Sequence, residues 1–309
     1  MNTQANATSE SYFDPQASAP AAISAAQRLY WALRRELWEN RSIYIAPLAA
    51  AGVALFGFLL TLIHLPEKMR AAAALDPMQQ HERIEQPFDA AAALLMGTFL
   101  IVGMFYCVEA LQRERRDRSI LFWKSLPVSD LTTVAAKVSI PFVVLPLLTF
   151  AITFATQLIM LLASSAVLAG SGLSVATYWA QVSLLQMSLL LLYHLMTVHV
   201  LGSAPIYGWL LLVSAWARRA AFLWAVLPPL AICTLEKLLF NTAHFAAFLG
   251  QFFTGGTEGL YAPGTMPMDP MTHLTPGKFL STPGLWIGLA ITAAFLAAAV
   301  RLRRYRGPM

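Results

Sequence analysis

Charge is scarce in this 309-residue chain. Only 12% of the residues are Asp, Glu, Lys or Arg, whereas soluble domains average roughly 25%. Hydrophobic residues make up 58% of the chain. Several stretches carry few or no charges over about 20 residues, the length that a helix needs to cross a bilayer. The composition therefore excludes an ordinary soluble protein and predicts an integral membrane protein.

The sequence motifs of common enzyme classes are missing as well. The chain contains no GxxxxGK[ST] phosphate loop, because TPGKFL at 275–280 lacks the upstream glycine that such a loop requires. The HExxH, GxSxG and CxxC patterns are also absent. We therefore expect no catalytic residue, no metal site and no ATP held by a phosphate loop in this chain.

Cysteine is rare, and the N-terminal residues lack an apolar segment. Cys107 and Cys233 lie far apart within apolar runs, which indicates small buried side chains rather than a disulfide framework. Residues 1–20 are polar, rich in Ala and Ser, and without the apolar core of a secretory signal. We expect a disordered tail at 1–21 and one all-α membrane domain at 22–309.

The first organised element is AAISAAQRLYWALRRELWEN at 21–40. Its apolar residues recur at spacings of three and four, which predicts one face of a helix; they are Ile23, Ala26, Tyr30, Leu33 and Leu37. Trp31 and Trp38 lie two turns apart, and arginines occupy the other faces. This pattern is typical of a helix in the membrane interface, and packing on another protein surface is the alternative.

Six membrane spans are predicted from the apolar runs, at 43–65, 89–110, 138–165, 178–216, 220–242 and 284–300. The fourth is broken by Gly202, Ser203 and Pro205, and the fifth by Pro228-Pro229. Because 178–216 exceeds one bilayer thickness as a helix, it crosses either once with a kink or twice. The following pair Arg218-Arg219 favours a single crossing. An apolar run at 244–253, too short to span, predicts a re-entrant or interfacial helix.

Basic residues divide unevenly between the segments on the two sides of these spans. With a single crossing at 178–216, 16 of the 21 Lys and Arg residues fall on one side. The other five are Lys68, Arg70, Arg83, Lys237 and Lys278. Because Lys and Arg concentrate in cytoplasmic segments, we expect six spans with both termini in the cytoplasm.

One segment outside the spans combines charge with large apolar side chains. It reads RERRDRSILFWKSLPVSD at 113–130. Asp117 or Ser119 can cap a short helix over 120–124, which Pro127 ends. Ser129 is then expected to cap the third span, with Asp130 in its first turn. Anchoring in the lipid interface and docking to another protein both fit this apolar patch rimmed by charge.

The same stretch resembles the cytoplasmic loop of type-2 ATP-binding-cassette (ABC) exporter permeases. The resemblance rests on Glu114 to Ser119, the apolar run from Ile120 to Lys124, and SLPVSD at 125–130. It departs where Arg118-Ser119 replace a common Gly-Thr pair. In that family this loop is a coupling helix that docks on a separate nucleotide-binding subunit. The resemblance implies the docking residues Arg115, Arg116, Arg118, Ser119, Ile120, Leu121, Phe122, Trp123, Lys124, Ser125, Leu126 and Pro127. Phe122 and Trp123 would be the buried anchors and the basic residues the rim.

The resemblance implies a permease subunit in the bacterial inner membrane. ATP and Mg²⁺ would bind the partner ATPase rather than this chain. The other partners would be membrane lipid and a second permease copy or a sister permease, with no nucleic acid. Two other classes remain open, an ion-coupled secondary transporter and a membrane assembly or sensing protein without transport. The first of these predicts internal repeats and charges in the middle of spans, and neither is clear.

A few polar residues lie in or near the spans. Glu109 is expected to pair with one of Arg115, Arg116, Arg118, Arg218 and Arg219. His194 and His199 are five residues apart, which places them on different faces of an α-helix, and helix packing or pore lining is favoured over metal binding. Glu236 and Lys237, near the outer end of the fifth span, are either functional or directed to the interface.

Overall fold

The computed structural model describes residues 24–72, 74–117, 119, 129–254 and 276–305. Within these ranges all regular elements are helices, which confirms the all-α prediction. Six of them are long and apolar enough to cross a membrane, the pattern of a multi-pass membrane protein. The tail expected at 1–21 lies outside the described residues.

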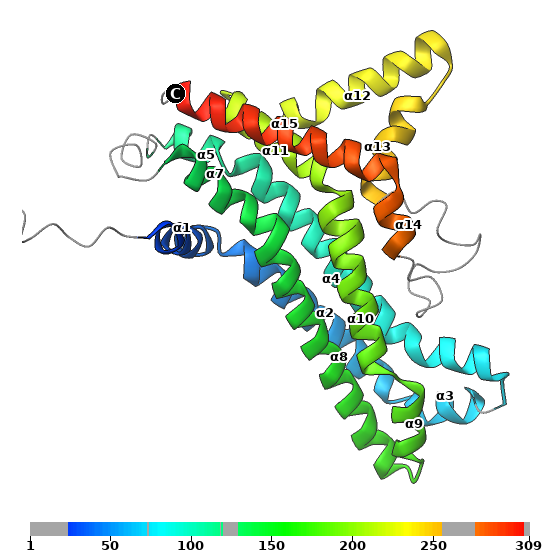
Figure 1. The fold of residues 1–309 in the computed structure, drawn as a ribbon. Coiled ribbons are helices and arrows are strands. Elements are labelled where there is room, and N and C mark those ends of the chain that lie inside the picture. The colour runs from blue at the N-terminus through cyan, green and yellow to red at the C-terminus, as the bar shows by residue number, and fades with distance from the viewer. Residues whose placement is uncertain (1–23, 73, 118, 120–128, 255–275, 306–309) are drawn as a thin grey trace, which may run out of the picture.

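Helix α1 (Ala25–Glu39) lies crosswise to the helices that follow it, as Figure 1 shows by presenting it nearly end-on. It begins with a capping box, in which the Ser24 hydroxyl accepts from the Gln27 amide and the Gln27 side chain accepts from the Ser24 amide. After Asn40 the chain turns into α2 (Ser42–Leu62), the first of the long apolar helices.

The second span is longer than its apolar run. After the short α3 (Leu65–Ala72), helix α4 extends over Pro77–Glu109, whereas hydropathy predicted 89–110. Its first turns are polar, so hydropathy does not reveal them. Pro77 fits the first helical position because its missing N–H needs no partner there. The chain then bends into α5 (Gln112–Arg116).

The third span is a continuous helical run with a local change of pitch. It comprises α7 (Asp130–Ser139), the π-helical η1 (Ile140–Val144) and α8 (Leu145–Gly170). Pro141 lies in η1 and Pro146 follows it, and each removes a backbone donor from the ladder. The predicted cap is confirmed, since the Ser129 hydroxyl accepts from the Thr132 amide at 3.1 Å.

The fourth apolar region is built from four helical pieces placed end to end. They are α9 (Val175–Gln181), α10 (Leu184–His194), the π-helical η2 (Leu195–Gly202) and α11 (Ala204–Trp216). The predicted break at 202–205 is present. A second break, at Val182 and Ser183, was not predicted.

The fifth apolar region is one helix, α12 (Ala221–Phe240). It runs through Pro228 and Pro229, so the expected interruption there was wrong. The predicted short helix is confirmed as α13 (His244–Thr254), which packs on η2 and α12. The described chain ends with α14 (Pro276–Ser281) and α15 (Pro283–Tyr305).

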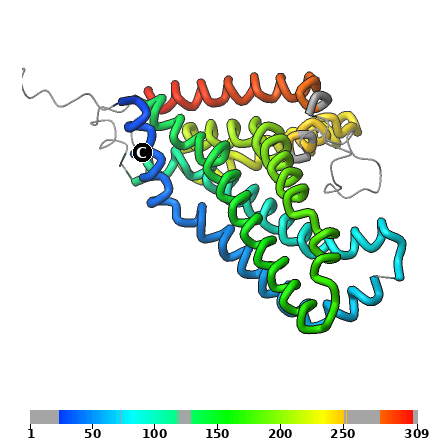
Figure 2. Tube along the Cα trace, turned by 60° about the horizontal axis from the view of Figure 1, so that its bottom comes forward, coloured from blue at the N-terminus to red at the C-terminus, as the bar shows by residue number. Residues whose placement is uncertain are grey.

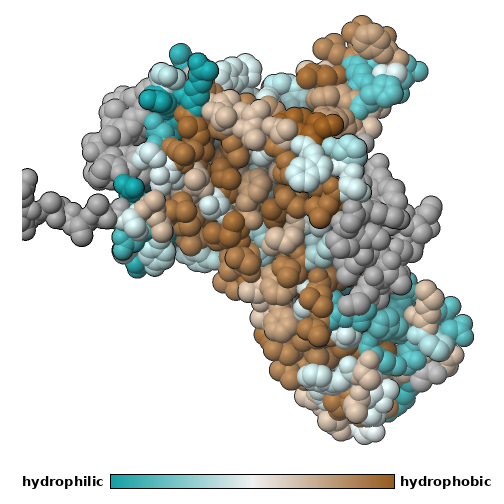
Figure 3. All heavy atoms as spheres, in the orientation of Figure 1, coloured by the Kyte–Doolittle hydropathy of each residue, from teal (hydrophilic) through white to brown (hydrophobic). Residues whose placement is uncertain are grey.

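Helices α2, α4 and α8 pack on one another, and α11 packs along both α4 and α15 (Figure 2). Helix α12 stands apart from this bundle in Figure 1 and buries only Ala221 and Ala225. Cys107 is fully buried and Cys233 half-buried, and both are free thiols, as predicted. Figure 3 shows apolar side chains over the middle of this face and hydrophilic ones gathered at its ends.

Candidate functional site

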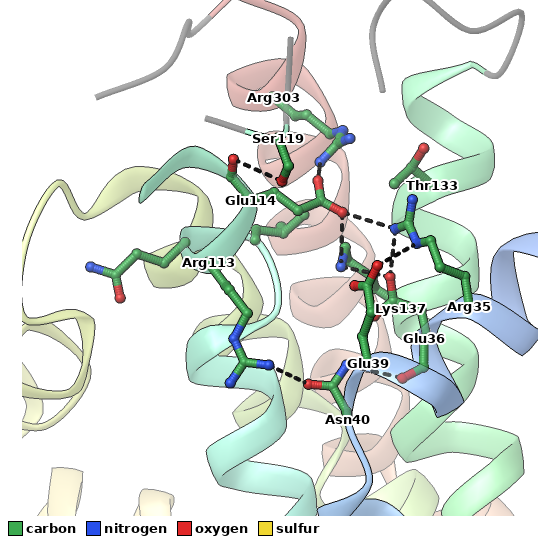
Figure 4. A network of polar contacts seen from close by, with 12 residues as sticks. Arg35, Glu36, Glu39, Asn40, Arg113, Glu114, Ser119, Thr133, Lys137 and Arg303 are labelled. Carbon is green, nitrogen blue, oxygen red and sulfur yellow. Dashed lines mark hydrogen bonds and ion pairs between the residues drawn. The ribbon is translucent and has the colours of Figure 1, made fainter. Parts of the chain in front are cut away.

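Four charged side chains are buried together at one end of the molecule (Figure 4). Glu36, Glu114, Lys137 and Arg303 are each at most 5% exposed. They come from α1, α5, α7 and α15, so the cluster joins four helices that are distant in sequence. Together with Arg35 and Asp130, these residues are called the ion network below.

Lys137 occupies the centre of the ion network. Its ammonium lies 2.8 Å from a Glu36 carboxylate oxygen and 3.1 Å from a Glu114 oxygen. The Arg35 guanidinium bridges the same two carboxylates, at 2.8 Å and 3.0 Å. Each buried charge therefore faces at least one opposite charge, which buried ions require because desolvation is costly.

Arg303 connects α15 to both α5 and α7. Its Nη1 donates to the second oxygen of Glu114, and its Nε donates to Asp130 at 3.1 Å. With three carboxylates and three cations, the formal charges of the ion network cancel. Glu114 and Asp130 lie on either side of segment 118–128 in the sequence, and one guanidinium joins them.

Glu36 is held in its ionised form. Burial alone raises the pKa of this carboxyl, but the neighbouring Lys137 and Arg35 cations outweigh burial and bring the pKa below its ordinary value. The Tyr106 hydroxyl also donates to Glu36, at 2.9 Å. For Glu39 burial prevails over the neighbouring Arg35 cation, and the pKa of this carboxyl is raised. Glu36 is therefore a fixed charge rather than a proton donor at neutral pH.

Sequence analysis did not single out Glu36, Lys137 or Arg303, although a signal exists. Glu36 follows Leu33 by three positions and precedes Leu37, so it lies on the apolar face of α1. Lys137 lies three residues after buried Val134 and three before buried Ile140. Arg303 follows buried Ala299 by four residues. A charged residue within an apolar helical stripe is the pattern that identifies such a network.

Helix α5 is fastened to the end of α11. The Ser214 hydroxyl accepts from the Leu111 and Gln112 amides at 2.9 Å and 3.0 Å. Arg115 donates to the Ala215 carbonyl at 2.7 Å and is only 5% exposed. This burial contradicts the expectation that Arg115 supplies charge to an exposed docking rim, because its guanidinium is used inside the fold.

The other predicted docking residues have different standings. Arg116 is exposed beside Asp117, at 3.4 Å, and so is accessible for a rim. Ser119 donates to the Glu114 carbonyl at 3.3 Å. The remainder lie outside the described residues, and their role stays a prediction: Arg118, Ile120, Leu121, Phe122, Trp123, Lys124, Ser125, Leu126 and Pro127.

Glu109 pairs with an arginine that was not among its expected partners. Its carboxylate lies 2.7 Å from Arg113, one turn further along the chain. Arg113 also donates to the Asn40 side chain at 3.0 Å, and the Asn40 amide group donates to the Glu36 carbonyl. Glu109 is exposed, so this pair lies outside the buried cluster and links α4 to the end of α1.

The prediction that His194 and His199 lie on different helix faces was wrong, because the helix changes its pitch there. Because π-helical hydrogen bonds join residues five apart, the start of η2 brings His194 and His199 onto neighbouring positions of one side. His194 is buried, with Nδ1 3.0 Å from the Leu190 carbonyl oxygen. The His199 ring lies 5.7 Å from the Phe99 ring. Both positions fit the helix-packing reading of these side chains.

Glu236 organises the chain after α12. Its carboxylate accepts from the Thr242 hydroxyl at 2.9 Å and from the His244 and Phe245 amides at 2.7 Å and 2.8 Å. It therefore caps the start of α13. Lys237 is exposed, as expected of a side chain directed to the interface.

The exposed face of α1 is aromatic and basic. Tyr30, Trp31 and Trp38 are each more than half exposed, and the Arg34 guanidinium lies 5.3 Å from the Trp31 ring. Tyr30 was expected on the same face as Leu33 and Leu37, but only the two leucines pack against the core. One face of α1 therefore packs on the protein and the opposite face carries the tryptophans.

No family model, curated protein or solved structure matches this chain. Its interpretation therefore rests on its own residues. Among the described residues, no three His, Cys, Asp or Glu side chains are grouped so as to hold a metal ion. The ion network offers paired charges rather than a free acid or base. Its contacts join α1, α5, α7 and α15 at one place.

Proposed function

We propose that this chain is the membrane-spanning permease subunit of an ATP-driven exporter whose ATPase is a separate protein. The six candidate spans and the resemblance of residues 113–130 to an ABC exporter coupling loop support this proposal. ATP and Mg²⁺ would bind the ATPase, and a second copy or a sister permease would complete the export pathway.

One observation carries the proposal beyond the resemblance. Arg303 binds both Glu114 and Asp130, the described residues on either side of the candidate docking segment. A force passed through this segment would therefore reach two helices, α5 and α7, that one guanidinium joins. Breaking one buried pair costs about 3–5 kcal/mol, so the junction resists separation under load.

The path of the movement follows from the same contacts. A push on segment 118–128 reaches α5 and α7 first, because these helices continue directly from it. Lys137 and Arg35 then carry the displacement to α1, and Arg303 carries it to α15. Ser214 carries it to α11. The ion network thus connects a docking event outside the membrane to helices inside it.

The sidedness of the chain is part of the proposal. The described beginning of the chain and the end of α15 lie at the ion-network end of the molecule in Figure 1, where the basic segments also gather. This arrangement supports an even number of crossings with both termini in the cytoplasm of a bacterial inner membrane. Trp31 and Trp38 then lie at the level of the lipid headgroups.

Docking is tested with the variant Phe122→Ala/Trp123→Ala in a co-expressed complex. The probe is a candidate ABC ATPase subunit, recovered with the permease through a tag on the permease. The double variant is expected to lose the ATPase subunit. Trp38→Ala, which removes an exposed tryptophan from α1, is the matched control and should retain it. Full retention by the double variant with unchanged ATP hydrolysis would refute docking at this segment.

Transmission is tested separately with Glu114→Gln, which weakens both the Lys137 and the Arg303 contacts. We expect the ATPase to remain bound while its stimulation by this chain in proteoliposomes falls at least several-fold. Transport that needs no ATP and follows an imposed pH gradient would instead favour the ion-coupled class. A chain that neither transports nor stimulates any ATPase would favour assembly or sensing.

A further inference from the structure

Helix α1 presents a basic and aromatic side away from the ion network. Trp31, Arg34 and Trp38 follow one another at spacings of three and four residues, which places them along one side of the helix. The two tryptophans are 57% and 79% exposed. Arg41 is exposed directly beyond α1, where the chain enters the first span. These four residues are called the α1 surface below.

Two neighbouring arginines of α1 have opposite surroundings. Arg35 is paired within the ion network, with carboxylate oxygens of Glu36 and Glu114 at 2.8 Å and 3.0 Å. The Arg34 guanidinium instead lies 5.3 Å from the centre of the Trp31 ring. Within the part of the chain that the structure describes, neither Arg34 nor Arg41 forms an ion pair with a carboxylate. The α1 surface therefore presents two positive charges whose counter-charge has to come from outside these residues.

The position of α1 suggests where that counter-charge lies. The helix runs crosswise to the long apolar helices, and only Asn40 and Arg41 separate it from α2 (Figure 1). Exposed apolar side chains begin on α2 at Ile45 and Leu48. An amphipathic helix joined in this way to the start of a span lies in the plane of the membrane, at the boundary between headgroups and hydrocarbon.

Tryptophan and arginine match the two kinds of chemistry at that boundary. The indole ring prefers the level of the lipid headgroups. The guanidinium is weakly hydrated and donates two parallel hydrogen bonds to a phosphate group. Stacking on Trp31 also restrains Arg34 beside an aromatic ring that inserts at the same depth. Tryptophan alone would not distinguish lipids by charge, whereas arginines without a protein partner do.

We propose that the α1 surface binds the headgroups of anionic phospholipids. Arg34 and Arg41 bind the phosphate groups, and Trp31 and Trp38 insert beside them. Each arginine near an anionic lipid surface strengthens binding by about fivefold, so the surface selects lipids with a net negative charge over zwitterionic ones. Binding of this kind needs neither ATP nor an ATPase.

A protein partner is the competing occupant of the α1 surface. Such a partner would have to offer acidic side chains opposite Arg34 and Arg41. The connection of α1 to the first span favours lipid, because a helix at the boundary of the hydrocarbon meets headgroups along its whole outer side. The opposite side of the helix already packs on this chain through Leu33 and Leu37.

The test places a reporter on the α1 surface, because exposed arginines elsewhere in the chain also attract anionic lipid. Gln27 is exposed one turn before Trp31 and accepts a bimane dye through Gln27→Cys. Cys233→Ser removes the half-buried thiol, and Cys107 is fully buried. The probes are nitroxide-labelled phosphatidylglycerol and phosphatidylcholine, titrated into the full chain in a neutral detergent. Quenching of the dye reports binding at α1 alone.

The lipid fraction in the micelle that gives half of the maximal quenching is then compared between variants. Arg34→Gln/Arg41→Gln should raise this fraction at least about tenfold for phosphatidylglycerol and less than about twofold for phosphatidylcholine. The matched control is Lys68→Gln/Arg70→Gln, which removes two exposed positive charges from α3. It should leave both values within about twofold of those of the parent chain.

A second variant separates lost attraction from a damaged helix. Arg34→Lys/Arg41→Lys keeps both charges and should retain most of the affinity for phosphatidylglycerol, because an anionic surface attracts lysine as well. A loss as large as in the glutamine variant would overturn the proposal, since charge would not be what was removed.

Three further results would also overturn it. The first is a glutamine variant that binds phosphatidylglycerol no more weakly than the α3 control. The second is an equal loss for phosphatidylcholine, which would mean that lipid charge is not recognised. The third is unchanged quenching while a co-expressed ATPase subunit is released, which would assign the α1 surface to a protein partner. Because the quenching needs no transport or ATP hydrolysis, lipid binding and the proposed function can fail independently.

Discussion

Two buried polar regions differ in how their polar groups are paired. One is the ion network, and the other is the row Thr149, Thr153 and Gln157 on α8, called the α8 seam. In the ion network each charged group faces a partner of opposite charge within the chain, at 2.8–3.1 Å for Lys137. In the α8 seam, neutral atoms on successive turns lack partners in the described chain. Charge explains the difference, because an unpaired buried ion costs far more than an unpaired hydroxyl.

This difference bears on how firmly each region fixes the positions of its helices. The ion network must be specific, since each carboxylate needs a cation at the correct place, and it therefore fixes the relative positions of α1, α5, α7 and α15. The α8 seam carries no formal charge, so it does not require a partner group at one fixed place to the same degree. We infer that the helices joined by the ion network move as a connected set.

The largest expected effect comes from removing the central cation. Lys137→Met leaves Glu36 and Glu114 buried without their shared ammonium, although Arg35 and Arg303 remain. We expect a loss of about 3–5 kcal/mol in the free energy of unfolding, the usual penalty for breaking a buried pair. Unfolding by sodium dodecyl sulfate, monitored by tryptophan fluorescence, measures this loss.

The control for that change is Arg116→Ala. Arg116 is exposed, with its side chain 67% accessible, beside Asp117, and such surface pairs contribute about 0–1 kcal/mol. A loss in Lys137→Met no larger than the loss in Arg116→Ala would mean that the ion network is not a specific junction. The contrast with the α8 seam would then disappear.

A second change should partly reverse the first. Glu36→Gln in the Lys137→Met background removes one of the two stranded charges and keeps the size of the side chain. We expect a recovery of about 1–3 kcal/mol relative to Lys137→Met, because interacting residues couple by this amount in double-mutant cycles. Additive losses would show that Glu36 and Lys137 do not interact in the native state.

The membrane spans and the ion network differ in how far the sequence predicts them. The spans were predictable because hydropathy over about 20 residues reports membrane crossing directly. Their ends were not: α4 begins twelve residues before the predicted start, since its first turns are polar. The two π-helical segments were also missed, and η2 reversed the conclusion drawn from the spacing of His194 and His199.

The ion network was predictable only in part. Glu114 lay in a segment that its composition made conspicuous, but its partner Arg303 is 189 residues away. Pairing over such distances depends on the packing of α15 against α11 and α7, which local periodicity cannot supply. The prediction that Arg115 lies at an exposed rim was wrong for the same reason. A charged residue was assigned to the surface, whereas its neighbours in the fold bury it.

A smaller effect is expected from pH. The pKa of Glu36 is below its ordinary value of about 4.3, so folding favours the ionised form. The resulting stabilisation is fully present above about pH 4.3 and is lost as the pH falls toward the lower pKa of the folded state, at no more than about 1.4 kcal/mol per pH unit. Glu39, with a raised pKa, acts in the opposite direction.

Comparing the wild-type chain with Glu36→Gln isolates this contribution, because both keep Glu39. The difference in the free energy of unfolding between the two should be constant from pH 7 to about pH 5 and should shrink below that. A difference that stays constant down to pH 3 would show that Glu36 does not gain its charge stabilisation from Lys137 and Arg35. The α8 seam has no carboxylate among its members. The difference in the free energy of unfolding between the wild-type chain and Thr149→Val/Thr153→Val should therefore show no such change with pH.

The smallest effect is expected from a cap beside the ion network. Ser129→Ala removes the hydroxyl that accepts from the Thr132 amide at the start of α7, which typically costs about 1 kcal/mol. Ser139→Ala is the control on the same helix, since its hydroxyl only donates to the Ala135 carbonyl within the helix. It should cost less than about 0.5 kcal/mol, as is usual where no cap is lost.

Because Asp130 follows Ser129 directly, loss of the cap should also loosen the Arg303 contact. The cost of Ser129→Ala should therefore be smaller in a chain that already carries Asp130→Asn. Equal costs in the two backgrounds would show that the end of segment 118–128 is set by the α7 cap alone, and that the ion network does not position it.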